Sequence, residues 1–256
     1  MKARVCLIAG TTMVLASFAL AQNATPNGQI AELVLANHIL ANEGVLDAYG
    51  HVSVRDERNP AHFFLARGLP PSIVTAADIA EYDQDSKPVP DSQNAGYLER
   101  FIHGEIYRAR PDVMAVIHFH AGDVIPFGVT SVPLRPMIHM AGFLPPSIPI
   151  FEIRKAGGIT DMLVRTNALG KALADTLGDK PAVLMRGHGA VVAGPSLHIT
   201  TGWAYYMMVN ARLQLQAMTL GGGKVTYLDP EEAKKATLQD GFERAWTFWK
   251  SKVERR

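Results

Sequence analysis

The apolar segment from Val113 to His120 is the feature that most constrains the fold of this chain. It is too short and too apolar for a surface helix, so we predict a strand buried on both faces of a sheet. Further strands are predicted at 51–54, 62–65, 182–185 and 190–193. The last two flank a tight turn, Arg186-Gly187-His188-Gly189, which contains two glycines.

Amphipathic patterns predict helices between these strands, at 30–43, 96–110 and 198–220. Thr75 has the residue type of an N-cap and favours a helical start for 77–82. Helices interleaved with strands are typical of an α/β fold. We therefore expect one α/β domain over 29–256.

The composition is that of a folded, nearly neutral protein. Its 256 residues include 25 Lys and Arg and 24 Asp and Glu, for a formal net charge of +1. This balance gives no electrostatic reason to expect a nucleic-acid partner. Hydrophobic residues make up 48% and charged residues 19%, which is unlike a disordered chain.

Residues 1–21 are typical of a secretory signal. Two basic residues precede the apolar run 5–20, which ends in Ala19-Leu20-Ala21. A membrane anchor is the alternative, but about 16 residues are short for a spanning helix. Cleavage after Ala21 would remove Cys6, the single cysteine, and leave a polar leader at 22–28. A cysteine-free mature chain suits a periplasmic or secreted protein that is not held at the membrane.

The motif His118-Phe119-His120 ends the central predicted strand. Alternate residues of a strand share a face, so both imidazoles would lie on one side, roughly 7 Å apart along the chain. This geometry allows both rings to bind one divalent metal ion. The pair alone is weak evidence for a metal site, because two ordinary polar residues at a strand edge give the same pattern.

Two further residues complete a candidate site. His188 lies between two glycines, where the backbone bends freely and the ring can project as a third ligand. Glu99 opens a predicted helix whose inward face is otherwise apolar, so desolvation is expected to raise its pKa. A solvated glutamate in a first helical turn is the alternative for Glu99.

These segments resemble the class II aldolase and adducin head family. The resemblance rests on Tyr97-Leu98-Glu99, Ile117-His118-Phe119-His120 and the His188-Gly189 turn, and it covers about residues 29–233. It implies a three-layer α/β/α sandwich, a homotetramer and an active site near a subunit boundary. It also implies one divalent ion per chain on His118, His120 and His188, with Glu99 as the working carboxylate. Zinc is the favoured ion, with manganese, magnesium, cobalt or iron as alternatives.

Departures from the family pattern predict a different substrate from that of the sugar-phosphate aldolases. The phosphate-binding hydroxyl residues are replaced by Gly96-Tyr97-Leu98 and by Ala66-Arg67-Gly68. The guanidinium group of Arg67 could then bind a substrate carboxylate through two hydrogen bonds. The alternative is an ordinary surface arginine. The family's glycine-rich turn appears as Gly50-His51-Val52-Ser53, which makes Gly50, His51 and Ser53 substrate-binding candidates. In the family, an aromatic residue that acts as the catalytic acid occupies the position of Met140. Because methionine cannot donate a proton, His139 is a candidate proton donor.

The chain therefore looks most like the branch that decarboxylates hydroxy-carboxy-muconic semialdehydes or dihydroxyphthalates. This resemblance implies a metal-dependent lyase that releases carbon dioxide from a small carboxylated substrate. An aldolase or epimerase acting on a non-phosphorylated sugar or hydroxy-acid is one alternative. A non-catalytic binding module of the adducin type is the other.

Overall fold

The computed structural model describes residues 26–89, 96–236 and 241–255. The predicted signal at 1–21 lies outside these ranges. Helix α1 (Pro26–Asn42) begins inside the segment predicted as a polar leader. No helix in the described ranges is long and apolar enough to cross a membrane.

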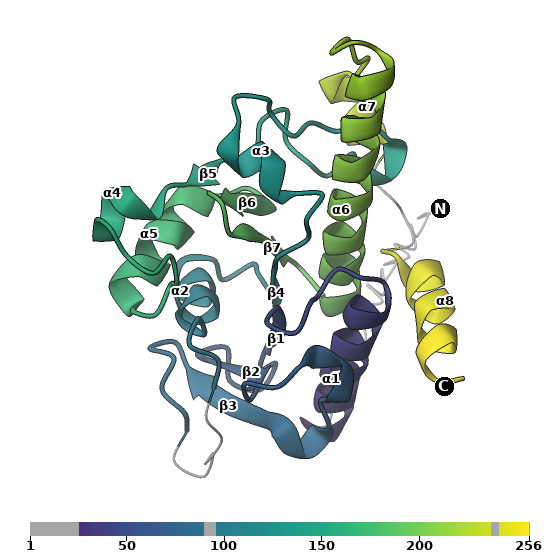
Figure 1. The fold of residues 1–256 in the computed structure, drawn as a ribbon. Coiled ribbons are helices and arrows are strands. Elements are labelled where there is room, and N and C mark those ends of the chain that lie inside the picture. The colour runs from purple at the N-terminus through teal and green to yellow at the C-terminus, as the bar shows by residue number, and fades with distance from the viewer. Residues whose placement is uncertain (1–25, 90–95, 237–240, 256) are drawn as a thin grey trace, which may run out of the picture.

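One mixed sheet of seven strands lies at the centre of the molecule (Figure 1). Its strand order is β3-β2-β1-β4-β7-β6-β5, and all neighbours pair antiparallel except β5 and β6. The strands are β1 (His51–Arg55), β2 (His62–Ala66), β3 (Ile79–Asp83), β4 (Ala115–Phe119), β5 (Ile150–Phe151), β6 (Ala182–Met185) and β7 (Gly189–Gly194). The five predicted strands all form, each within two residues of its expected ends.

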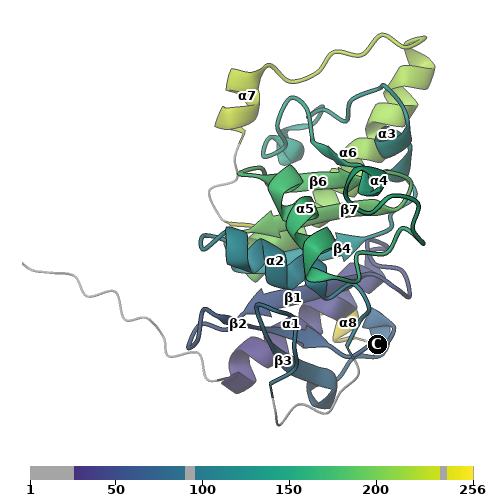
Figure 2. The same cartoon turned by 90° about the vertical axis from the view of Figure 1, so that its left-hand side faces the viewer.

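Helices cover both faces of the sheet and complete three α/β/α layers, as the family resemblance implies (Figures 1 and 2). One face carries α1, α6 (Leu197–Leu220) and α8 (Glu243–Val253), and the other carries α2 (Phe101–Ala109) and α5 (Asn167–Leu177). Shorter helices lie in the connections: η1 (Pro71–Ile73), η2 (Ala76–Asp78), α3 (Ile125–Val129), η3 (His139–Ala141), α4 (Ile153–Gly157) and α7 (Pro230–Lys235).

Strand β4 separates two hydrophobic cores because its side chains alternate between the two faces. Ala115, Ile117 and Phe119 pack in the core beneath α1 and α6. Val116 packs in the core beneath α2 and α5. His118 shares the face of Val116, so the central strand directs this imidazole toward the α2 layer.

Two predicted elements differ from the structure. Residues 79–83 form strand β3 and not a helix. They pair with β2, and their burial alternates along the chain, as is typical of a strand. Thr75 does cap a helical turn, but only the three residues of η2, where Asp78 accepts hydrogen bonds from the Thr75 amide and hydroxyl. Helix α2 begins at Phe101, so Glu99 lies in the turn before it and not in the predicted helix.

Close packing between α2 and α5 gives a first testable prediction. A Cβ added at Gly170 would lie 2.4 Å from the Phe101 carbonyl oxygen. We expect Gly170→Ala to lower the free energy of unfolding by about 1–3 kcal/mol, because overpacking outweighs the helix propensity of alanine. Denaturant unfolding measures this, with Gly122→Ala as the control, since a Cβ there meets no atom within 4 Å. Equal destabilisation by both substitutions would contradict the prediction.

The ion pairs of His198 predict a pH-dependent contribution to stability. His198 at the start of α6 lies 3.2 Å from Glu32 on α1 and 2.8 Å from Glu243 on α8. Burial acts to lower its pKa, but the two carboxylates outweigh burial and raise the pKa above its ordinary value. A raised pKa in the folded state stabilises the protein below the unfolded-state pKa of about 6.5, and this contribution is lost as the pH rises through the folded-state value.

We therefore expect His198→Gln to be less stable than the wild type at about pH 5.5, with the difference shrinking toward pH 8.5. Urea unfolding of both proteins across this range is the measurement. A difference that grows with pH would contradict the assigned ion pairs.

Candidate metal centre

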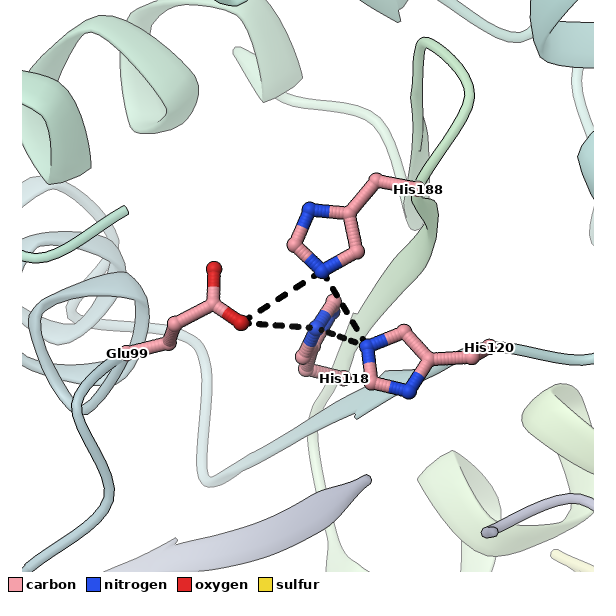
Figure 3. A group of neighbouring side chains, drawn as sticks. All are labelled: Glu99, His118, His120 and His188. Atoms are coloured by element: carbon pink, nitrogen blue, oxygen red, sulfur yellow. Dashed lines mark hydrogen bonds and ion pairs between the residues drawn. The ribbon is translucent and has the colours of Figure 1, made fainter. Parts of the chain in front are cut away.

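Three imidazoles and one carboxylate converge at the carboxyl end of β4 (Figure 3). The Nε2 atom of His120 lies 2.9 Å from Nε2 of His118 and 3.1 Å from Nε2 of His188. One ligand atom from each of these histidines and from Glu99 lies within 4.8 Å of the others. The structure thus brings together the three predicted ligands and the predicted carboxylate.

The opposite nitrogen of each ring is held by a group that can only accept a hydrogen bond. Nδ1 of His118 lies 3.1 Å from the Ala190 carbonyl oxygen, and Nδ1 of His188 lies 3.1 Å from that of Met162. Nδ1 of His120 lies 3.1 Å from the Asp47 carboxylate. Each Nδ1 must therefore carry the hydrogen, which leaves three Nε2 lone pairs facing one centre.

The turn between β6 and β7 brings His188 to the end of β4. Phe119 on β4 pairs with Ala190 on β7, so the turn lies beside the strand end that carries His118 and His120. A Cβ at Gly189 would lie 2.1 Å from the Phe119 carbonyl oxygen. Only glycine allows this approach, and Gly187 adopts a left-handed φ of 63° in the same turn.

Glu99 is buried, with only 7% of its surface exposed, and its two carboxylate oxygens have different partners. Oε1 accepts a hydrogen bond from the Val164 amide at 2.8 Å. Oε2 lies 3.4 Å from Nε2 of His188 and 3.6 Å from Nε2 of His118. Burial acts to raise the pKa of Glu99, but when His118 and His188 are protonated, their charge and hydrogen bonds outweigh burial and lower the pKa below its ordinary value. The expected raised pKa is therefore wrong, because the sequence pattern did not include the histidines.

This donor set fits a divalent metal ion. Neutral imidazole nitrogens suit zinc and similar ions, and three protein nitrogens with an open position are typical of catalytic sites. Hydrogen bonds that fix the far side of each ring are the usual support for such ligands. His118, His120 and His188 would hold the ion, and Glu99 Oε2 faces the same centre.

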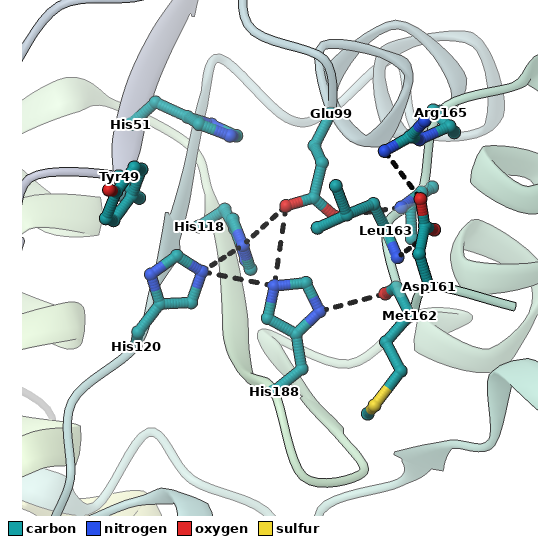
Figure 4. A network of polar contacts seen from close by, with 12 residues as sticks. Tyr49, His51, Glu99, His118, His120, Asp161, Met162, Leu163, Arg165 and His188 are labelled. Carbon is teal, nitrogen blue, oxygen red and sulfur yellow. Dashed lines mark hydrogen bonds and ion pairs between the residues drawn. The ribbon is translucent and has the colours of Figure 1, made fainter.

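A cavity of about 830 Å³ opens beside these residues (Figure 4). Its walls are largely apolar and come from Leu69, Pro70, Tyr97, Leu98, Met162 and Leu163. Among the described residues that line it there is no lysine or arginine. The acidic Asp161 on its wall is itself paired with Arg165 at 2.5 Å. The cavity therefore suits a largely apolar molecule.

Two predicted substrate contacts in the glycine-rich turn have other positions. Ser53 is fully buried behind the cavity wall, where its hydroxyl contacts His103 and Tyr107. Gly50 is buried too, and its amide donates a hydrogen bond to Asp47 at 2.8 Å. Neither residue lines the cavity. His51 does line the cavity, as predicted.

Arg67 and His139 are also not brought to the cavity within one chain. The Arg67 guanidinium pairs with Asp78 at 2.6 Å, and hydrogen bonds from Thr75 and Arg67 lower the pKa of Asp78 to about 2. His139 lies in η3, which packs on α6, and it lines a separate small cavity with Trp203 and Phe242. The sequence placed both near the site from the family pattern alone.

Two residues of the site had not been predicted. Asp47 precedes the glycine-rich turn and orients His120. His103 lies in helix α2 and is fully buried beside His51. Glu99 and His103 both fall in the predicted helix 96–110, and their spacing of four residues, about one helical turn, could have placed them on the same side of it.

Comparison with known proteins identifies the family. The model of the class II aldolase and adducin N-terminal domain matches residues 31–215. The chain belongs to this family. The predicted family resemblance is thereby confirmed, together with the α/β fold.

The most similar family members include two decarboxylases. Decarboxylase tropJ from Talaromyces stipitatus is 38% identical over 85% of this chain and 91% of its own length. The 3,4-dihydroxyphthalate decarboxylase from Arthrobacter keyseri is 30% identical over 90% of this chain and 95% of its own length. A solved aldolase II superfamily protein from Pseudomonas syringae has a TM-score of 0.74 at 23% identity, covering 91% of this chain and 95% of its own, which shows the shared fold.

Because Asp47 orients His120, we predict that two substitutions at this site weaken metal binding to different degrees. We expect His118→Ala to lose the bound ion and Asp47→Asn to weaken metal affinity about 10–100-fold, because the charge behind His120 is removed. Chelator competition followed by elemental analysis measures both effects.

Glu81→Gln is the matched control for Asp47→Asn. It alters a similar carboxylate-histidine pair, between Glu81 and His62, on the distant strands β2 and β3. Equal metal affinities of Asp47→Asn and the wild type would show that Asp47 does not support the centre.

Proposed function

We propose that this class II aldolase family member is a metal-dependent decarboxylase of a carboxylated hydroxy-aromatic or muconic semialdehyde-type substrate. The observation that carries the proposal is the convergence of three imidazole Nε2 atoms and the Glu99 carboxylate at the wall of a largely apolar cavity. The two decarboxylases that cover nearly the whole chain support this reaction over aldol cleavage.

The reaction has one electronic difficulty. Breaking the bond between a ring carbon and its carboxylate releases carbon dioxide and leaves an electron pair on the substrate. That pair is delocalised toward a neighbouring oxygen, and a proton must then reach the carbon. A bound divalent ion supplies Lewis-acid stabilisation of negative charge on that oxygen.

Glu99 is the residue that we assign to proton transfer. The hydrogen bond from the Val164 amide fixes Oε1, so the carboxylate cannot rotate away from the centre. Oε2 is left facing the three imidazoles and the cavity. A carboxylate in this position can take a proton from a substrate hydroxyl and return it to carbon.

The cavity walls support a substrate that is mostly apolar. Tyr97 closes one side of the cavity, with its hydroxyl held by the Leu69 carbonyl oxygen. The lack of lysine and arginine among the described wall residues disfavours a phosphorylated substrate. This agrees with the loss of the hydroxyl residues that bind phosphate in the aldolases of the family.

Glu99→Gln tests the proposal directly. We expect the variant to keep its metal but to release carbon dioxide from 3,4-dihydroxyphthalate or a related hydroxylated acid about 10²–10⁴-fold more slowly than the wild type, because the base is lost. Carbon dioxide release and metal content are measured on the same preparations.

Other outcomes would select the alternative functions. Release of an aldehyde in place of carbon dioxide would indicate an aldolase. A folded wild type that neither retains nor gains metal would indicate a binding module of the adducin type. Full activity of Glu99→Gln would remove Glu99 from the mechanism.

Cleavage after Ala21, export and the homotetramer stay predictions of the sequence and of the family resemblance. We propose that the mature enzyme acts outside the inner membrane as a tetramer. The mass of the exported chain and its size in solution test these two points.

A further inference from the structure

A chain of short hydrogen bonds leads from the cavity into the protein interior. Nδ1 of His51 lies 2.6 Å from Nε2 of His103, and Nδ1 of His103 lies 2.6 Å from Oγ of Ser53. Oγ of Ser53 lies 2.8 Å from the hydroxyl of Tyr107. All four side chains are at most 1% exposed. We call these four residues the buried relay.

Strand β1 and helix α2 each contribute two members of the buried relay. His51 and Ser53 are two residues apart on β1 and therefore point to the same face of the sheet. His103 and Tyr107 are four residues apart on α2, so they lie one above the other on the same side of the helix. The relay is thus part of the contact between the sheet and the α2 layer, and its geometry is fixed by both elements.

The hydrogen bonds of the relay have a single direction. The Tyr107 hydroxyl lies 2.8 Å from Ser53 Oγ, and its other contact is the Val116 backbone amide, which can only donate, so we assign the hydroxyl hydrogen of Tyr107 to Ser53 Oγ. The Ser53 hydroxyl must then donate to Nδ1 of His103. Burial lowers the pKa of His103 to about 3, so this ring is neutral and carries one hydrogen, on Nε2. That hydrogen is donated to Nδ1 of His51, which places the hydrogen of His51 on its own Nε2.

The second ring nitrogen of His51, Nε2, is not used by the relay. His51 is one of the residues that line the cavity, and no described residue forms a hydrogen bond with its Nε2. The ring lies 5.0 Å from the His118 ring and 4.5 Å from the Tyr97 ring, between centroids. Figure 4 shows it beside the imidazole cluster, across from the segment that carries Met162.

We propose that His51 is a fixed hydrogen-bond donor that binds an acceptor oxygen of the substrate beside the metal centre, with His103, Ser53 and Tyr107 as positioning residues. The three metal-site histidines carry their hydrogen on Nδ1, whereas His51 and His103 carry it on Nε2. In a cavity whose described walls offer no lysine or arginine, this N–H is a neutral donor for a phenolate or carboxylate oxygen. The choice of ligand class rests on the proposed function.

Nitrogen NMR of the full mature chain tests the tautomers without any substrate. The protein is labelled with ¹⁵N-histidine and loaded with zinc, and His51→Asn and His103→Gln assign the signals. We expect both rings to be neutral with the hydrogen on Nε2. A hydrogen on Nδ1 of His51 would overturn the proposal, whatever reaction the protein catalyses.

Ligand binding tests the role of the donor. With 2-hydroxybenzoate as the probe, calorimetry on the zinc-loaded protein is expected to show a Kd about 10–100-fold weaker in His51→Phe, because a hydrogen bond to a charged oxygen is lost. Ser53→Ala is expected to weaken binding and to change the tautomer signal of His103. Ser86→Ala is the control, since it removes a buried serine hydroxyl that bonds the Arg100 carbonyl outside the relay.

The two proposals fail in different ways. Unchanged binding of the probe by His51→Phe at full metal content would overturn the donor role of His51. The expected tautomers and probe binding, without release of carbon dioxide from any screened acid, would leave His51 as a donor and overturn decarboxylation. Carbon dioxide release with His51 protonated on Nδ1 would overturn the donor role alone.

Discussion

The pairing of β4 with both β1 and β7 is the interaction on which the site depends. His118 on β4 lies opposite His51 on β1 and opposite Val191 on β7. One strand thus sets the positions of His118, of His51 and of the turn that carries His188. A buried central strand cannot shift its register without moving its apolar side chains to the wrong face. The hydrophobic effect on β4 therefore fixes the geometry of polar groups that contribute nothing to the core themselves.

Local patterns in the sequence were sufficient for five of the seven strands and for the pair His118 and His120. His118 and His120 share a face because strand side chains alternate, and this rule needs only the neighbouring residues. The two glycines around His188 indicated a tight turn in the same way. The family resemblance then joined His188 and Glu99 to the pair, although they lie far apart along the chain.

Residues whose roles depend on tertiary contacts could not be predicted in this way. Asp47 contacts His120 although the two residues are 73 positions apart in the sequence. His103 contacts His51 over a separation of 52 positions. Arg67 carried the right charge, but Asp78 on the adjacent turn binds it. The sequence pattern indicated the burial of Glu99, which raises its pKa. It did not indicate the two facing imidazoles, which lower it, so the direction of the pKa shift was predicted wrongly.

Backbone atoms of the segment 162–164 contact the side chains of the centre, while the side chains of Met162 and Leu163 line the cavity. The Met162 carbonyl accepts from His188 and the Val164 amide donates to Glu99, whereas the side chains of Met162 and Leu163 belong to the cavity wall. Every residue type except proline offers the same backbone donor and acceptor. Evolution can therefore reshape this wall for a new substrate while the support of His188 and Glu99 is inherited unchanged. Such a division between side chain and main chain separates the residues that shape the cavity from the atoms that support the centre.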